Sequence, residues 1–330
     1  MASAHAHFPL VSTDGSRVPE LDAVATARWR QRVPKASPWL HDWVGGRMAE
    51  RLDWIRAQPS AWVSWSPLLA GETAHRAVVQ RYPQARVWLA GELGAATWAR
   101  WQPRAQPWWR RWRRAAQVAQ TPWGLLAGVA APDQPVPQSV GLVWANMVLH
   151  LTAEPRRLLQ QWYDWLVEDG FLMFSCLGPD TARELRAVHA AMGWPPPAAP
   201  YVDMHDWGDL LVAVGFAEPV MDMERVTLTY PDAQRLLAEL RTTGRNWHPA
   251  RHPALRGRAW QTRWLQAVQE HLPRDAQGRL CLTVEVVYGH AIRPRPRLTV
   301  AAETRVPLQH LRQALRPRAQ EAARPAAEDR

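Results

Sequence analysis

A strand-to-helix junction carries the clearest chemical signal in this chain. Residues 171–176 form an apolar run that passes through Gly178, Pro179 and Asp180 into a segment typical of a helix start. Open α/β sheets bind their ligands beyond the carboxyl ends of such strands, where the backbone turns into the next helix. The sequence therefore predicts a ligand site close to residues 177–186.

Two histidines, His150 and His205, are candidates for contact with a polar substrate, because imidazole donates or accepts hydrogen bonds and titrates near neutral pH. Both rings are equally compatible with a capping role or a hydrogen-bonded position in a loop. No third ligand lies near the run Asp203-Met-His-Asp206, so we predict no metal site. We interpret Asp180 and Asp206 as helix caps rather than catalytic acids.

The two cysteines, Cys176 and Cys281, lie in apolar runs and lack metal-ligand spacing. We expect them to be buried thiols in a reducing compartment. No apolar run reaches about 18 residues, and residues 1–9 lack the charged-then-apolar pattern of a signal peptide. These features predict a cytoplasmic protein.

Alternating helix and strand patterns supply the elements that position these residues. Apolar residues at three- and four-residue spacing predict a helix over residues 40–57. Strands over 61–65 and 85–90, with a helix over 72–81 between them, make a βαβ unit. Its crossover connection requires parallel strands.

The second half of the chain continues this order. Glu154-Pro155 opens a helix, because proline is favourable at the first helical position, and Asp169-Gly170 ends it. Gly215 is interpreted as the left-handed cap of a later helix. The remaining predicted elements cover residues 140–145, 171–176, 206–214 and 282–287, and the last is expected to be antiparallel because its residues alternate.

The formal net charge of +10 is carried almost entirely by arginine, which favours acidic partners. The segment 108–114 mixes arginine with tryptophan. Such a mixture can stack on single-stranded nucleic acid or lie at an anionic membrane surface. The alternative is a helix whose tryptophans pack on the sheet while its arginines face water.

Several short motifs follow one another in a fixed order: Arg47-Met-Ala-Glu-Arg-Leu-Asp-Trp-Ile55, Arg81-Tyr-Pro83, Leu142-Val-Trp-Ala-Asn146, Gly178-Pro-Asp-Thr181, Asp203-Met-His-Asp206, Met221-Asp-Met-Glu224, Thr227-Leu-Thr-Tyr230 and Val286-Val-Tyr-Gly-His290. This series resembles class I S-adenosylmethionine-dependent methyltransferases, and specifically the biotin-pathway malonyl-carrier-protein O-methyltransferases. The resemblance covers about residues 43–290 and is strongest after Val140.

The resemblance implies an α/β fold of the Rossmann-like class I methyltransferase type. We expect a mostly parallel sheet with an antiparallel last strand and helices on both faces. The chain then divides into a polar N-terminal arm (1–38), a methyltransferase-like domain (39–292) with a Trp/Arg-rich insertion-like segment (98–138), and a basic, largely disordered tail (293–330).

The resemblance also implies S-adenosylmethionine as cofactor and assigns its site to Ser64, Ser66, Gly71, Glu92 and Asn146. Glycines are needed there because bare backbone must pass close to the amino-acid tail of the cofactor. Ser64 stands where the family has an acid, and Ser66 and Leu68 stand in place of glycines. We therefore expect side chains in the space that the cofactor needs.

The other acids of the family's cofactor site are also replaced. Gly91 stands at the position of the acid that holds the ribose, and Glu92 follows it. No acid occurs around residues 128–131, where the family has one for the adenine, and Gly141 replaces a fourth. This pattern predicts a cofactor pocket that has been lost or rebuilt.

The substrate implied by the resemblance is a malonyl thioester on an acidic acyl carrier protein, which is methylated on its free carboxylate. This carboxylate is ionised at neutral pH, so the reaction needs no general base. An arginine fork would hold it. The implied substrate-binding residues are His150, Arg183, Arg186, His205 and Arg241, with Arg245 as a further arginine candidate.

Three hypotheses follow. The chain is a divergent methyltransferase that binds its cofactor through Glu92 and a rebuilt loop, or it is a catalytically inactive methyltransferase-fold protein that binds an acidic partner such as a carrier protein. The third hypothesis is a nucleic-acid or membrane-surface binder that works through the segment 108–114.

Overall fold

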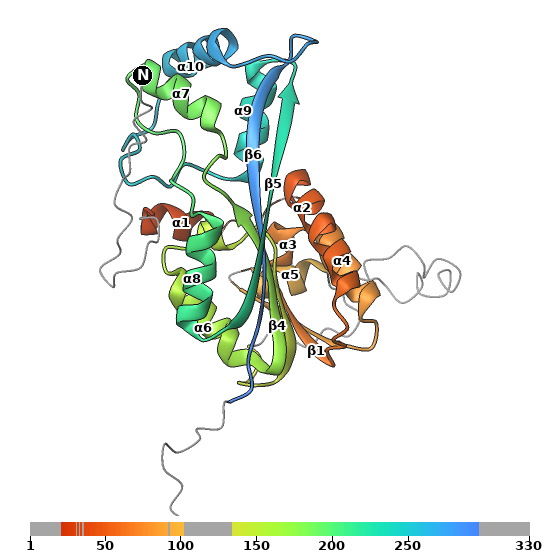
Figure 1. Ribbon diagram of the computed structural model, residues 1–330. Helices are drawn as coiled ribbons and strands as arrows, with labels where there is room; N and C mark the ends of the chain where they lie inside the picture. Colours follow the sequence, from red (N-terminus) through yellow and green to blue (C-terminus); the bar gives the residue numbers. More distant parts are fainter. Residues whose placement is uncertain are drawn as a thin grey trace, which may run out of the picture. The chain divides into compact units, whose positions relative to one another are not determined.

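The computed structural model describes residues 21–296 except residues 31, 33, 35, 92 and 102–133, and it leaves the side chain of Arg30 undescribed. The described residues up to Pro294 belong to one unit. Their strands form a six-stranded sheet in the order β2-β1-β3-β4-β6-β5 (Figure 1). The strand bounds are β1 Ala61–Trp65, β2 Arg86–Ala90, β3 Val140–Ala145, β4 Leu166–Leu177, β5 Ala217–Tyr230 and β6 Leu280–Ile292.

The sheet is mostly parallel. Strand β1 pairs in parallel with both β2 and β3, and β3 pairs in parallel with β4. Strand β6 is antiparallel to its two neighbours, β4 and β5. The predicted parallel βαβ unit and the predicted antiparallel late strand are therefore confirmed. Strand β5, which the sequence did not predict, forms the edge beside β6.

Helices cover both faces of the sheet, as expected (Figure 1). On one face lie α2 (Trp39–Glu50) and α4 (Glu72–Arg81), and on the other lie α6 (Pro155–Trp165) and α8 (Met204–Val214). Side chains of β1 alternate between the two faces, so that Trp62 belongs to the core under α2 and α4 while Val63 belongs to the core under α6 and α8. The shorter elements are α1 (Ala23–Arg30), η1 (Arg51–Trp54), α3 (Pro67–Ala70), α5 (Gly94–Trp101) and η5 (Leu149–Leu151).

A third apolar cluster joins three helices to the ends of the long strands β5 and β6. The helices are α7 (Arg183–Ala191), α9 (Ala233–Thr243) and α10 (Arg258–His271), which gather at one end of β5 and β6 in Figure 1. Fully buried Leu236, Val268 and Leu280 lie in this cluster. The cluster holds α9 and α10 beyond the carboxyl end of β4.

Three local predictions are corrected. The helix predicted over 40–57 ends at Trp54, because α2 tightens into η1 and Ile55 is extended. The turn predicted at Asp169-Gly170 is an irregularity inside β4, which begins at Leu166, and Asp169 has a φ of 60° there. Asp203, not Asp206, is the N-cap of α8, since its carboxylate accepts a hydrogen bond from the backbone N–H of His205.

Several predictions lie outside the described residues. They concern Glu92, the segment 108–114, the position around 128–131, most of the arm 1–38 and nearly all of the tail 293–330. Within the described ranges, none of the helices combines the length and the apolar character that crossing a membrane requires.

Candidate functional site

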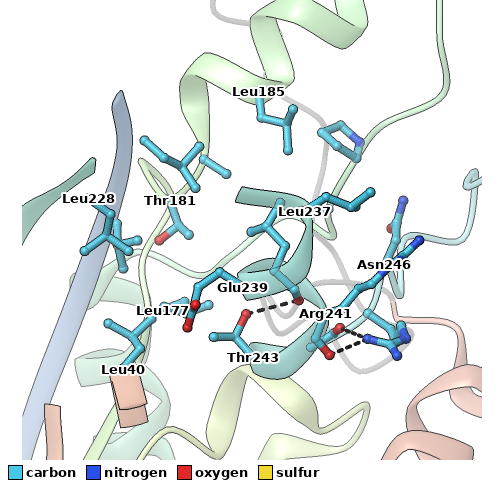
Figure 2. Close-up of a pocket in the computed structure, with 18 of the residues that line it drawn as sticks. Leu40, Leu177, Thr181, Leu185, Leu228, Leu237, Glu239, Arg241, Thr243 and Asn246 are labelled. Carbon is cyan, nitrogen blue, oxygen red and sulfur yellow. Dashed lines mark hydrogen bonds between the residues drawn. The ribbon is translucent and has the colours of Figure 1, made fainter. Parts of the chain in front are cut away.

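A cavity of about 300 Å³ lies at the carboxyl end of β4, beside the loop that follows β3. We call it the first cavity. Its walls come from α2, α7, α9, α10 and the ends of β5 and β6, and Figure 2 shows Leu40, Leu177, Thr181, Leu185 and Leu237 around it. The cavity lies where the strand-to-helix junction at residues 177–186 predicts a ligand. Further lining residues are Met147, His150, Tyr201, Leu228, Glu239, Arg241, Arg245, Trp247, Arg256, Trp260 and Trp264.

His150 is the one predicted histidine that lines the first cavity. Its ring is buried, and burial followed by the nearby His41 lowers its pKa well below the usual value, so the ring is neutral at pH 7. The backbone N–H of Leu177 donates to Nδ1 at 3.3 Å, which places the ring proton on Nε2. The His150 and Tyr201 rings meet edge to face, with their centroids 5.9 Å apart. His150 therefore offers a neutral N–H donor at the cavity.

Three arginines line the first cavity and pair with no carboxylate among the described residues: Arg241, Arg245 and Arg256. Arg245 donates to the backbone carbonyls of Arg241 and Gly244 and lies over the Trp29 ring at 4.9 Å. Burial, and then the charges of Arg32 and Arg241, lower the pKa of Arg245. Arg256 lies over the Trp260 ring at 3.6 Å. Positive charge at this cavity is thus left without a described anion.

The single acidic side chain among the described lining residues is that of Glu239, which Figure 2 shows beside Thr243. It pairs with Arg235 at 3.7 Å and is 12% exposed. Glu239 therefore forms an ion pair within α9, with Arg235 one turn earlier. It does not neutralise the three arginines.

Arg186 does not line the cavity but holds one of its walls. Its guanidinium donates to the carbonyls of Pro179 and Thr181, in the turn between β4 and α7. Burial lowers the pKa of this guanidinium. Because Thr181 and Ala182 line the first cavity, Arg186 positions the wall rather than contacting the space inside it.

Two further substrate candidates lie away from the first cavity. Arg183 is 54% exposed and pairs with Asp180 at 3.5 Å and Glu184 at 3.2 Å. His205 is 79% exposed, and its Nδ1 lies 2.6 Å from a carboxylate oxygen of Asp203. The structure therefore brings His150, Arg241 and Arg245 together and leaves Arg183 and His205 outside the group.

Two of the described candidates for cofactor contact, Ser64 and Asn146, form hydrogen bonds with other groups of the protein. The Ser64 hydroxyl lies 2.8 Å from Nδ1 of His75, and both side chains are fully buried. Ser66 has a φ of 46°, the left-handed conformation that glycine adopts without strain. Neither Ser64, Ser66, Gly71 nor Asn146 lines the first cavity.

Three consecutive carbonyls at the end of α3 each accept a side-chain donor from a distant segment. The Ser37 hydroxyl donates to Leu68 at 3.0 Å, His41 Nδ1 to Leu69 at 2.7 Å, and the Asn146 amide to Ala70. We call this set the carbonyl clamp. The four residues of α3 are buried beneath it.

A second cavity, of about 710 Å³, lies at the carboxyl ends of β1 and β2. Its described lining includes Trp65, Gly91 and Gly94, and residues of α6. Glu154 is the one carboxylate among these residues; it is 70% exposed and pairs with Arg157 at 3.5 Å. None of the four described cofactor candidates lines this cavity either.

The chain is similar in sequence to named proteins over most of its length. It is 38% identical to malonyl-acyl-carrier-protein O-methyltransferase from Laribacter hongkongensis, over 302 residues that cover 86% of this chain and 92% of the relative. The identity to the protein of the same name from Gallionella capsiferriformans is 35%, with coverage of 80% and 87%. This chain belongs to the malonyl-acyl-carrier-protein O-methyltransferase family.

Solved structures are less similar. A putative methyltransferase from Bacillus halodurans is 10% identical with a TM-score of 0.46, and covers 76% of this chain and all of its own. The cyclase SpnF is 16% identical with a TM-score of 0.42, and the match covers 81% and 87% of the two chains. At such scores the likeness adds nothing to the fold derived from the strand order. No family model matches the chain.

Membership of a methyltransferase family raises the question of whether the described residues fit S-adenosylmethionine. The amino-acid tail of this molecule carries an ammonium and a carboxylate, which need free polar partners. At the β1–α4 turn the Ser64 hydroxyl is bonded to His75 and the carbonyls of Leu68, Leu69 and Ala70 accept from the carbonyl clamp. The described residues of this turn do not fit the tail.

The sequence did not indicate several residues that line the first cavity of this family member, namely Tyr201, Trp247, Arg256, Trp260 and Trp264. Most of them belong to α10 and the segment before it. The spacing of Trp260, Trp264 and Val268 is helical and could have revealed α10 as an amphipathic helix. No local pattern indicates that α10 would reach the carboxyl end of β4.

Proposed function

We propose that this chain binds the malonyl thioester of an acyl carrier protein and that the first cavity receives the malonyl group. The observation that carries the proposal is the presence of Arg241, Arg245 and Arg256 at an apolar cavity, without a carboxylate partner among the described residues. Malonyl-acyl-carrier protein is the substrate in the names of the relatives.

The chemistry of the malonyl group matches this arrangement. Its free carboxylate loses hydration on entering an apolar space, and only a charged partner compensates for that loss. Guanidinium groups bind carboxylates through two parallel hydrogen bonds. The walls formed by Leu177, Leu185 and Leu237 suit the apolar methylene and thioester.

His150 supports the same assignment. Its ring is neutral because burial lowers its pKa, so it donates a hydrogen bond through Nε2 without adding charge. A neutral donor suits a thioester carbonyl, whereas the arginines suit the carboxylate. The two ends of the malonyl group thus have different partners.

The carrier protein fits the charge of the chain. The family resemblance implies an acidic acyl carrier protein as the substrate, whereas this chain has a net charge of +10. Opposite net charges accelerate encounter, and the acceleration falls as salt rises.

In the reaction named for the relatives, the malonyl carboxylate is the methyl acceptor. It is ionised at pH 7 and needs no general base. The described residues contribute by orienting the carboxylate and by keeping water away from it. No step is assigned to a methyl donor, since the residues at the β1–α4 turn do not fit its tail.

Calorimetric titration of the full chain with malonyl-acyl-carrier protein tests the proposal, and acetyl-acyl-carrier protein is the matched control because it lacks the carboxylate. We expect malonyl-carrier to bind at least about tenfold more tightly than acetyl-carrier, about 1.4 kcal/mol. Equal affinities, or no binding of either, would refute the assignment of the first cavity.

A further inference from the structure

We infer that the β1–α4 turn of this chain is a closed structural element, and that the chain binds its carrier substrate without binding S-adenosylmethionine. The statement about the carrier rests on the proposed function, whereas the statement about the cofactor rests on the turn alone. Five side-chain contacts close the turn, and each takes a polar group that a ligand would otherwise use.

The carbonyl clamp is the first set of contacts. Ser37, His41 and Asn146 come from the segment before α2, from α2 and from the loop after β3, and they reach three consecutive carbonyls of α3. Opening the turn would break all three hydrogen bonds. Buried carbonyls left without a partner are strongly unfavourable.

The N-terminus of α4 is closed as well. The backbone N–H of Glu72 donates to the Ser37 hydroxyl at 3.1 Å, and that of Thr73 donates to a carboxylate oxygen of Asp42 at 2.9 Å. A helix N-terminus attracts anions because its first N–H groups are unpaired. Here Asp42 supplies the anion from within the chain, at the place where a ligand carboxylate would be attracted.

Both amide hydrogens of Asn146 are used within the protein, and its oxygen already accepts one hydrogen bond. Its amide donates to the carbonyls of both His41 and Ala70, and its Oδ1 accepts from the Ser175 hydroxyl at 2.6 Å. Ser175 in turn accepts from the backbone N–H of Met147 at 3.0 Å. These groups form one buried and satisfied network.

Helix α2 also lies too close to α4 for a ligand to pass between them. A Cβ at Gly45 would lie 2.2 Å from Cβ of Ala74 and 2.9 Å from Nδ2 of Asn146. A Cβ at Gly71 would lie 2.9 Å from a carboxylate oxygen of Asp42. The two glycines allow direct contact between the helices rather than a path for a cofactor.

Ser64 replaces the acid expected near the end of β1, and its hydroxyl is used inside the core. Ser64 is bonded to His75, and the His75 ring lies between Trp62 at 5.3 Å and Trp101 at 4.9 Å. An ammonium group would find a hydroxyl already in use instead of a carboxylate. The site of the acid has become part of the core.

Calorimetric titration of the full chain with S-adenosylhomocysteine and S-adenosylmethionine, with and without saturating malonyl-acyl-carrier protein, tests this inference. The Laribacter hongkongensis relative in the same buffer is the positive control. We expect no saturable heat up to about 1 mM ligand for this chain. Saturable binding in either condition overturns the inference.

Two readouts separate the inference from the proposed function. Binding of malonyl-carrier without binding of the cofactor supports both, and binding of the cofactor overturns only the inference. If a chain that unfolds cooperatively does not bind malonyl-carrier, the proposed function and the statement about the carrier are overturned, and the statement about the cofactor is left intact. Hydrogen exchange at the amides of residues 69–71 gives a second test of the turn: these amides should exchange slowly and at unchanged rates when S-adenosylhomocysteine is added, and added protection would contradict closure.

Discussion

The carboxylate of Asp42 accepts a hydrogen bond of 2.9 Å from the backbone N–H of Thr73. One residue lies in α2 and the other in the first turn of α4, so a side chain of the protein caps the helix that follows the β1–α4 turn. Helix caps and favourable charges at helix N-termini stabilise the fold. The contact gives the turn a structural role that can be measured as stability.

Replacing Asp42 by alanine is expected to lower the free energy of unfolding by about 1 kcal/mol, because the N–H of Thr73 loses its acceptor. Urea unfolding at pH 7 measures the change. Asp53→Ala is the matched control, since Asp53 is 77% exposed and lies 3.8 Å from Arg81. A loss equal to that of the control would contradict the capping role.

Replacing Asn146 by alanine is expected to cost more, about 2–4 kcal/mol, because it leaves the carbonyls of His41 and Ala70 and the Ser175 hydroxyl without their partner in the core. The midpoint of urea unfolding reports it. Gln160→Ala removes an exposed bond to Asp164 and should change stability by less than about 0.5 kcal/mol. A small effect at Asn146 would mean that the network does not hold the turn.

Substitution of Arg241 or Arg245 by glutamine is expected to weaken malonyl-carrier binding about tenfold, because each change removes a charged hydrogen-bond donor at the first cavity. Arg183→Gln should bind within about twofold of the unaltered chain, since Arg183 lies outside the cavity and pairs with Asp180. Calorimetry at fixed ionic strength compares the three variants. Equal losses in all three would indicate a diffuse effect of net charge.

Stability is expected to fall as pH decreases below about 6.5, the ordinary histidine pKa. Burial lowers the pKa of His41 to about 4 and that of His150 well below its usual value, so the unfolded chain binds protons that the folded chain does not. The stabilisation is complete above pH 6.5 and declines below it by up to about 1.4 kcal/mol per pH unit for each histidine. Three less buried histidines with lowered pKa values act with the same sign: His189, His248 and His290.

Urea unfolding at pH 7.5, 6.0 and 5.0 measures this dependence. His150→Gln should flatten the decline by up to about 1.4 kcal/mol per pH unit. A decline that His150→Gln leaves unchanged would show that His150 is not held neutral by the fold.

Local patterns predicted the central elements well. The strands at 61–65 and 140–145 and the helix at 72–81 match β1, β3 and α4, because each is a short apolar run or an amphipathic stretch with clear ends. Gly215 caps α8 in the left-handed conformation, as its position predicted. The start of β4 was missed because Asp169-Gly170 resembles a turn and instead forms an irregularity within the strand.

The site was harder to predict because its contacts are distant in sequence. Asn146 and His41 lie 105 residues apart, and no spacing rule connects them. Sequence position alone also could not separate Arg241, which lines the first cavity, from Arg183, which lies outside it and pairs with Asp180. The sequence showed that Ser64 stands in place of the family's acid. That Ser64 bonds to His75 became evident only from the packing of α4 on β1.

Transfer of a labelled methyl group from S-adenosylmethionine to malonyl-acyl-carrier protein is the measurement that tests this account most directly. The Laribacter hongkongensis relative, assayed on the same carrier, sets the scale. The account predicts that the full chain binds the malonyl-carrier and forms no base-labile methyl ester above the protein-free blank. Formation of the ester to one turnover or more per chain would contradict it, and would mean that the β1–α4 turn opens to admit the donor.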